Sequence, residues 1–197
     1  MELTILEQAD TKSNSGVSTF GKTLLYATGG LAVGMSIICI PFVSPAFRKI
    51  CLPYVPATTR QLLGVTKALK GCTGTLLDVG SGDGRIVFIA AKLGFTAHGV
   101  ELNSVLVYYS RTITFFNHQY KNTRFFKKNL WTFDLKPYNN IVIFGVEQMM
   151  QEFEKKVSKE VKDGTTIVVC RFPLPNMIPV ETIGHGVDTV WKYVIKK

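Results

Sequence analysis

The sequence predicts an α/β domain with a mostly parallel sheet, and two observations carry that prediction. Short apolar runs alternate with helix-like segments over residues 75–195, and alternation on this scale is typical of a helix-covered parallel sheet. A glycine-rich turn, Asp-Val-Gly-Ser-Gly-Asp-Gly-Arg over residues 78–85, separates the first expected strand from the next expected helix. This order is typical of a corner that binds a nucleotide-like ligand.

An uncharged apolar stretch precedes the domain. Residues 24–43 contain no charged side chain, and a helix of that length, at about 1.5 Å per residue, matches the hydrocarbon core of a bilayer. Glu2, Glu7 and Asp10 precede the stretch, whereas a signal peptide begins with a basic region. The stretch also lacks the polar stripe of a buried core helix. The sequence therefore predicts one transmembrane helix over residues 22–44.

The charge distribution indicates a basic domain beside a membrane. The chain carries +9, and residues 1–43 contribute two lysines against three acids, so the remainder carries +10. Basic segments remain on the side from which a membrane helix is inserted, and they suit an anionic lipid face. The lipid bilayer is therefore an expected partner. No nucleic acid is expected, because the sequence shows no recognised nucleic-acid-binding module.

Four segments result from this division. Residues 1–21 are expected to be a flexible leader, 22–44 the anchor, 45–71 a proline-rich connector with a lead-in helix, and 72–197 the α/β domain. The four cysteines form no CxxC pair, and the three histidines have no ligand spacing, so neither a metal site nor a disulfide framework is indicated.

Capping residues and apolar spacing define the expected helices. Thr58 or Thr59 caps the lead-in helix, which ends at Gly71, and Gly94 closes a helix that begins at Arg85. Asn103 caps the next helix. The expected helices after the lead-in segment are 85–93, 104–118 and 148–161. The expected strands are 75–79, 97–102, 124–127, 140–144, 165–171 and, as a single terminal strand, 188–195.

The glycine turn differs from two other nucleotide motifs. A dinucleotide site needs G-x-G-x-x-G, and Arg85 occupies the position of the last glycine. A P-loop needs Gly-Lys followed by Ser or Thr, which is absent. The remaining pattern is D-x-G-x-G-x-G, with Glu101 at the end of the next strand, where an acid is expected to bind ribose hydroxyls.

This pattern resembles motif I of the class I methyltransferases, which implies a Rossmann-like fold and S-adenosyl-L-methionine as cofactor. The resemblance implies that Asp78 reaches the cofactor's ammonium group and Glu101 its ribose, while the loop backbone and the following helix start bind its carboxylate. The cofactor-binding residues implied in this way are Asp78, Gly80, Ser81, Gly82, Asp83, Gly84, Glu101, Asn129 and Leu130.

A closer resemblance rests on further motifs. Residues 78–87, Gly-Val-Glu-Leu-Asn at 99–103, Asn-Leu-Trp at 129–131, residues 142–150 and Cys-Arg-Phe-Pro at 170–173 are similar to the mitochondrial lysine methyltransferases that act on the ATP synthase c subunit and the adenine nucleotide translocase. The resemblance spans about residues 53–193. It implies a membrane-anchored protein-lysine N-methyltransferase in the mitochondrial inner membrane, with the domain facing the matrix. The implied partner is an integral membrane protein, the c subunit first and the translocase second.

Two positions and the end of the sheet depart from the family pattern. Asn129 stands where the family usually has aspartate, and an amide still offers a donor and an acceptor to adenine. Glu147 stands where proline commonly follows Phe-Gly-Val. The single terminal strand replaces the closing hairpin of this fold class, so a final strand is expected to be missing.

No catalytic base is assigned by the sequence. Glu147, Phe144 and Gly145 are the weak candidates near the acceptor, and Glu147 is as well explained as a solvated helix start. The lysines at 155, 156, 159 and 162 are expected on a solvated helix face. The alternatives are a lipid or small-molecule methyltransferase, favoured by the membrane tether, and a catalytically weak, cofactor-binding assembly protein, favoured by the three departures.

Overall fold

The computed structural model describes residues 18–43 and 56–197. The chain divides into two compact units, residues 1–40 and 41–197, and each is described by itself. Residues 1–17 of the predicted leader (1–21) and residues 45–55 of the predicted connector (45–71) lie outside the described residues.

The described part of the first unit is formed by the helix α1, Thr19–Val43, whose last three residues extend beyond residue 40. Its Thr19–Ile40 portion has a mean hydropathy of 1.8 and no buried residue, so its length and composition suffice to cross a membrane. The hydroxyls of Thr23, Thr28 and Ser36 donate to backbone carbonyls one turn earlier, which satisfies these polar groups inside the helix. The apolar stretch is therefore helical, as predicted, and its insertion in a bilayer stays a prediction.

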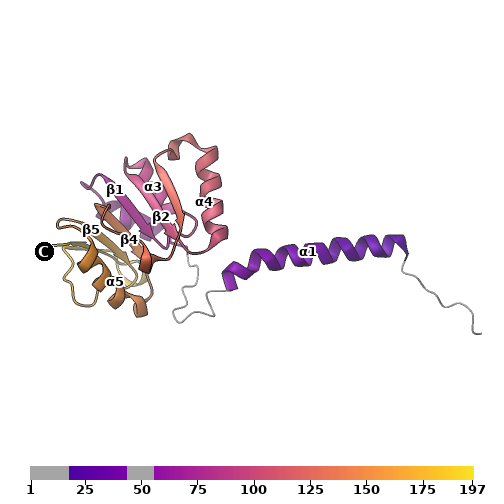
Figure 1. Cartoon of the computed structure of the whole chain (residues 1–197). Helices are drawn as coiled ribbons and strands as arrows, with labels where there is room; N and C mark the ends of the chain where they lie inside the picture. The colour runs from indigo at the N-terminus through magenta and orange to yellow at the C-terminus, as the bar shows by residue number, and fades with distance from the viewer. Residues whose placement is uncertain (1–17, 44–55) are drawn as a thin grey trace, which may run out of the picture. The chain divides into compact units, whose positions relative to one another are not determined.

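The second unit is built on one seven-stranded sheet (Figure 1). Its order is β3-β2-β1-β4-β5-β7-β6, and every pair is parallel except the two that involve β7. The strands are β1 (Thr75–Val79), β2 (Thr96–Glu101), β3 (Thr123–Lys127), β4 (Asn140–Phe144), β5 (Thr166–Cys170), β6 (Glu181–Ile183) and β7 (Val190–Val194). This confirms the Rossmann-like, mostly parallel architecture that the sequence predicts.

Helices cover the two faces of the sheet unequally. The helices α2 (Thr59–Ala68), α3 (Arg85–Lys92) and α4 (Ser104–Phe116) contribute Val65, Val87 and Val107 to one apolar core. On the other face, α5 (Glu147–Glu160) contributes Phe153 and Val157 to a second core. Much of the rest of that second core comes from the strands and from connecting segments, which supply Phe133, Leu135 and Leu174.

The terminal hairpin corrects the prediction of a missing strand. The expected strand 188–195 starts at Val190, because residues 186–188 form a 3-10 turn. A short strand that the sequence does not reveal, β6, pairs with β7 and completes the sheet. β6 has three residues, and its side chains are exposed or half-buried, so it lacks the apolar run by which strands are recognised.

Candidate active site

The glycine turn forms a tight loop at the end of β1. Gly80, Gly82 and Gly84 have φ of 72°, 53° and 83°, a region that side chains other than glycine avoid. The amides of Gly80 and Ser81 both donate to the carbonyl of Val100, at 2.9 and 3.1 Å. The loop is thus held against the end of β2, the neighbouring strand.

Close packing under the loop requires two glycines. A Cβ on Gly84 would lie 2.8 Å from Cζ of Phe125. A Cβ on Gly99 of β2 would lie 2.6 Å from Oγ of Ser81, which is buried and has no hydrogen-bond partner among the described residues. Above the loop the space is open, since a Cβ on Gly80 would meet nothing within 4 Å.

Glu101 links three backbone amides at the end of β2. Its Oε2 accepts from the amide of Gly82 at 3.0 Å, and its Oε1 accepts from the amides of Leu102 and Asn103 at 2.7 and 2.8 Å. An ionised carboxylate offers about four acceptor sites. Three are used here, so one lone pair on Oε2 remains for a ribose hydroxyl.

Asp78 is buried at the end of β1, with 3% of its surface exposed. Burial raises the pKa of its carboxyl well above the usual value, and the negative charges of Glu101 and Asp83 raise that pKa further. Two further carboxyl groups thus lie near Asp78 at this corner, although Asp83 also pairs with Arg85. A cluster of this kind favours a cationic ligand.

The acidic cluster and the open glycine loop fit S-adenosyl-L-methionine, whose sulfonium and ammonium groups are cations. Acceptors dominate this corner, because the amides of Gly80, Ser81, Gly82 and Gly84 already donate within the protein. The carboxyl groups of Asp78 and Glu101 therefore suit the ammonium and ribose roles expected for them. The amides, by contrast, are engaged before any ligand arrives.

Arg85 joins the loop to the segment before α2. Its Nε donates to Asp83 Oδ1 at 3.0 Å, and its Nη1 donates to the carbonyl of Ala57 at 2.8 Å. Thr58 caps α2 and donates to Asp188 Oδ1 at 2.7 Å. Arg85, which stands at the position of the last glycine of a dinucleotide motif, therefore connects the start of α3 to the segment before α2.

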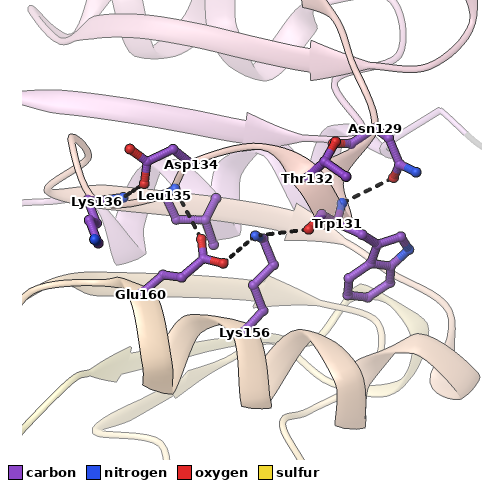
Figure 2. A network of polar contacts seen from close by, with 8 residues as sticks. All are labelled: Asn129, Trp131, Thr132, Asp134, Leu135, Lys136, Lys156 and Glu160. Atoms are coloured by element: carbon purple, nitrogen blue, oxygen red, sulfur yellow. Dashed lines mark hydrogen bonds and ion pairs between the residues drawn. The ribbon is translucent and has the colours of Figure 1, made fainter.

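Figure 2 shows how α5 holds the segment after β3, which includes Asn129 and Leu130. Lys156 Nζ donates to the carbonyl of Trp131 at 3.3 Å and pairs with Glu160 Oε1 at 2.6 Å. Glu160 Oε2 accepts from the amide of Leu135 at 3.3 Å. The prediction that Lys156 is solvated is wrong, because its side chain is 8% exposed.

Asn129 occupies the N-cap of the short 3-10 helix at Leu130–Thr132. Its Oδ1 accepts from the amide of Trp131 at 3.1 Å. Asparagine and aspartate are equally good at this position, so the change from the family's aspartate preserves the cap. The cap fixes the direction of the segment and leaves the side-chain amide at an exposed position, where a purine can reach it.

The three catalytic candidates lie at the end of β4 and directly after it. Phe144 is half-buried and Gly145 is buried, with a Cβ on Gly145 only 2.5 Å from Sδ of Met150. Glu147 is exposed and is the first residue of α5, where a carboxylate stabilises the helix dipole. Its position is thus also that of an ordinary helix start.

Arg171 is the residue at this edge whose conformation the sequence does not reveal. It follows β5 directly, next to the end of β4, because Cys170 pairs with Phe144. Its φ of 75° lies in the left-handed region, which costs an L-residue about 1–2 kcal/mol. Strain of this kind concentrates at functional sites, and nothing in a single sequence marks it.

Comparisons with known proteins identify the class. A model of the "ANTKMT methyltransferase domain" matches residues 78–181. Among solved structures, an RNA methyltransferase from Salinibacter ruber in complex with S-adenosyl-L-homocysteine superposes with a TM-score of 0.64 at 24% identity, over 72% of this chain and 94% of that one. The chain is an S-adenosyl-L-methionine-dependent methyltransferase of the Rossmann-like class.

Its family follows from closer relatives. The lysine N-methyltransferases of the ATP synthase c subunit from Xenopus laevis and Homo sapiens are 51% and 47% identical, over 84% and 89% of this chain and 73% and 76% of theirs. The adenine nucleotide translocase lysine N-methyltransferase of Mus musculus is 35% identical over 86% of this chain and 76% of its own. A model of the N-terminal domain of the c-subunit lysine N-methyltransferases matches residues 13–48. The chain belongs to this family of protein-lysine N-methyltransferases.

Proposed function

We propose that this enzyme is anchored in the mitochondrial inner membrane by α1 and methylates a lysine of the ATP synthase c subunit, with its domain facing the matrix. One observation carries the choice of substrate. The N-terminal model matched by residues 13–48 belongs to the c-subunit enzymes. The higher identity to those enzymes, 51% against 35% for the translocase enzyme, points the same way.

The residues of this site contribute to methyl transfer mainly by orienting the cofactor and the acceptor. The bound cofactor supplies a methyl group activated by its sulfonium. Asp78 receives the cofactor's ammonium group and Glu101 its ribose, while the segment at Asn129 and Leu130 borders the adenine. The remaining members of the cofactor site, Gly80, Ser81, Gly82, Asp83 and Gly84, form the turn that lets the ligand approach the main chain. Positioning of two reactants is worth several orders of magnitude in rate.

The acceptor lysine must arrive as a neutral amine, although its pKa is about 10.4 in water. A desolvated site beside a cationic cofactor lowers that pKa. Phe144 and Gly145, at the end of β4, supply the apolar wall of this site, and Arg171 lies beside them after β5. Glu147 is exposed at the start of α5, so it is not needed to explain methyl transfer.

The test compares membranes from cells with and without the protein. Mass spectrometry of lysine residues is expected to show methylation of the c subunit that disappears without the enzyme and returns with the wild-type chain. It should not return with Asp78→Ala or Glu101→Ala. An unchanged c subunit with a methyl-deficient translocase would overturn the choice of substrate. Label from the methyl donor in the lipid extract would favour a lipid methyltransferase instead.

Cofactor binding and label transfer, measured on the same protein, distinguish an enzyme from a non-enzymatic assembly protein. A cofactor-binding assembly protein would bind the methyl donor normally in calorimetry and transfer no label to any membrane protein. Purified full-length chain in lipid vesicles, given labelled donor and the purified c subunit, should transfer label to that substrate. Binding without transfer would overturn the proposed activity and leave the cofactor site in place.

A further inference from the structure

The outward face of α4 is an exposed aromatic surface. Tyr108, Tyr109, Phe115 and Phe116 are 75%, 52%, 79% and 78% exposed, while Leu106, Val107 and Ser110 of the same helix are buried in the domain. A helix that is apolar on all sides is normally buried. The four aromatic side chains, called here the α4 aromatic face, are therefore large apolar groups that the domain itself does not bury.

Another helix at the surface, α5, differs from α4 in the composition of its outward face. α5 has a polar outward face with Glu152, Lys155 and Lys159, and α4 contains a single charged residue, Arg111. Arg111 is exposed, and its Nε and Nη2 donate to the carbonyl of Phe125 on β3 at 3.0 and 2.7 Å. The one charge of α4 is therefore held toward β3, at the side of the α4 aromatic face.

Positive charge lies at the β3 side of this face, and negative charge is missing from it. Between Glu101 and Asp134 the sequence has no acidic residue and five basic ones, all of them exposed. Lys127 lies on the face of β3 that α4 covers, because it alternates with Phe125 of the core on that side, and Lys121 stands in the turn before β3. Figure 1 shows α4 along this end of the sheet. An aromatic centre with a basic margin complements an anionic lipid surface.

We propose that the α4 aromatic face docks into the headgroup region of an anionic bilayer, with Arg111, Lys121 and Lys127 beside the lipid phosphates. This inference rests on the membrane attachment proposed above, since a helix such as α1 would keep the domain close to lipid. Single-stranded nucleic acid binds aromatic side chains interleaved with cations in a groove, whereas no cation lies within this face. Tyrosine is enriched where proteins cross the lipid–water interface, and phenylalanine anchors interfacial helices.

Docking would restrict how the domain turns on its tether. A single apolar helix leaves rotation of the attached domain free, whereas a second contact through α4 fixes one side of the domain against the lipid. The start of α4 follows Glu101 directly, so the cofactor edge would be held at a set height above the bilayer. The fixed height of the domain would then help to bring a substrate lysine near the membrane surface into the active site.

Fluorescence quenching in vesicles tests this contact. The full-length chain, with its four cysteines changed to alanine, receives one bimane label at Phe116→Cys or, as a matched control, at Glu152→Cys on α5. Each protein is reconstituted into phosphatidylcholine vesicles with or without phosphatidylglycerol, and the lipids carry a nitroxide near the headgroup. We expect emission loss at position 116 in phosphatidylglycerol vesicles and none at position 152. The loss should vanish when Lys121 and Lys127 are changed to glutamine, and it should persist when Arg124 on the opposite face of β3 is changed.

Three results would overturn the inference. They are equal emission loss at both positions, no loss at either, and shielding of position 116 only when RNA or a purified membrane-protein substrate is added without lipid. Cofactor binding and circular dichroism check that each labelled chain is folded, and Tyr108→Cys replaces a Phe116→Cys variant that is not. The measurement needs neither methyl donor nor acceptor. A chain that docks without activity would contradict the proposed function alone, and an active chain with an unshielded α4 would contradict this inference alone.

Discussion

Oε2 of Glu101 lies 3.0 Å from the amide nitrogen of Gly82, so one carboxylate connects the end of β2 to the glycine loop. The same group also holds the amides of Leu102 and Asn103, where α4 begins. The position that is expected to bind ribose therefore also determines the shape of the loop that receives the rest of the cofactor.

Changing Glu101 to glutamine should weaken both the loop and the cofactor site. A glutamine can accept at only one of the two carboxylate oxygens, and hydrogen bonds to a charged group contribute about 1.5–3 kcal/mol. We expect a loss of unfolding free energy in that range and at least roughly tenfold weaker binding of the methyl donor by calorimetry. Glu152→Gln on the exposed face of α5 is the control. Binding equal to wild type in Glu101→Gln would rule out the ribose role.

Gly84→Ala should cost more stability than Gly94→Ala. Both positions have positive φ, 83° and 93°, so both substitutions meet backbone strain of about 1–2 kcal/mol. Only at Gly84 does the added Cβ collide with the ring of Phe125, at 2.8 Å, while at Gly94 it meets nothing within 4 Å. Overpacking adds about 1–3 kcal/mol. Urea denaturation of the two variants measures the difference, and equal losses would contradict the close packing under the loop.

Asp78→Asn should stabilise the protein in a pH-dependent way. Burial raises the pKa of Asp78, with Glu101 and Asp83 adding to the shift, so the folded state favours the neutral acid. That contribution is complete below the unfolded pKa of about 3.9 and is lost as pH rises through the folded pKa. The variant should therefore exceed wild type in stability at neutral pH, with an advantage that shrinks toward pH 4.

Denaturation at a series of pH values checks this, with the exposed-site variant Glu152→Gln as reference. A stability difference that is independent of pH would contradict the expected titration of Asp78. The same Asp78→Asn protein should bind the methyl donor more weakly, because the negative charge that suits the cofactor's ammonium group is gone. A variant that gains stability and loses binding is a common result when a functional carboxyl group is replaced.

Lys156→Met should loosen the segment that borders the adenine. The substitution removes the donor to the Trp131 carbonyl and leaves Glu160 unpaired, which costs about 1–3 kcal/mol when the groups are partly buried. We expect the KM for the methyl donor to rise while kcat stays near wild type, since no reacting group is touched. Lys155→Met, one residue earlier and exposed, is the matched control. A fall in kcat at unchanged KM would contradict a positioning role.

Arg171→Gly should relieve backbone strain and still impair the enzyme. Glycine adopts φ of 75° without penalty, so the unfolding free energy is expected to rise by about 1 kcal/mol. Methyl transfer to the acceptor should fall, because the arginine side chain at the end of β5 is lost. A variant that is more stable and fully active would show that the strain serves no purpose at this edge.

The sequence was a good guide where local signals agree. Asn140–Phe144 is a continuous apolar run and is the strand β4 within the predicted bounds. Asn103 caps α4 by accepting from the amide of Val105 at 2.9 Å. The glycine loop follows β1 directly, since three glycines at alternate positions favour such a turn. In each case residues within a few positions of one another determine the conformation.

Tertiary partners determine what the sequence could not reveal. β6 is a strand because β7 offers it an edge, although its own side chains are polar or half-exposed. Lys156 is covered because the carbonyl of Trp131, far along the chain, lies over it. The strain at Arg171 and the contact of Arg85 with Ala57 depend likewise on segments that meet only in the folded domain.

The position of β7 in the sheet has a consequence for how the domain folds while it is being synthesised. β7 is the last strand along the chain, yet it lies between β5 and β6, and a Cβ on Gly64 of α2 would touch Val190 Cγ2 at 2.9 Å. Until residues 190–194 leave the ribosome, β5 has an open edge and α2 lacks its packing against β7. The emerging domain therefore stays unfinished through most of its translation, while α1 has emerged long before.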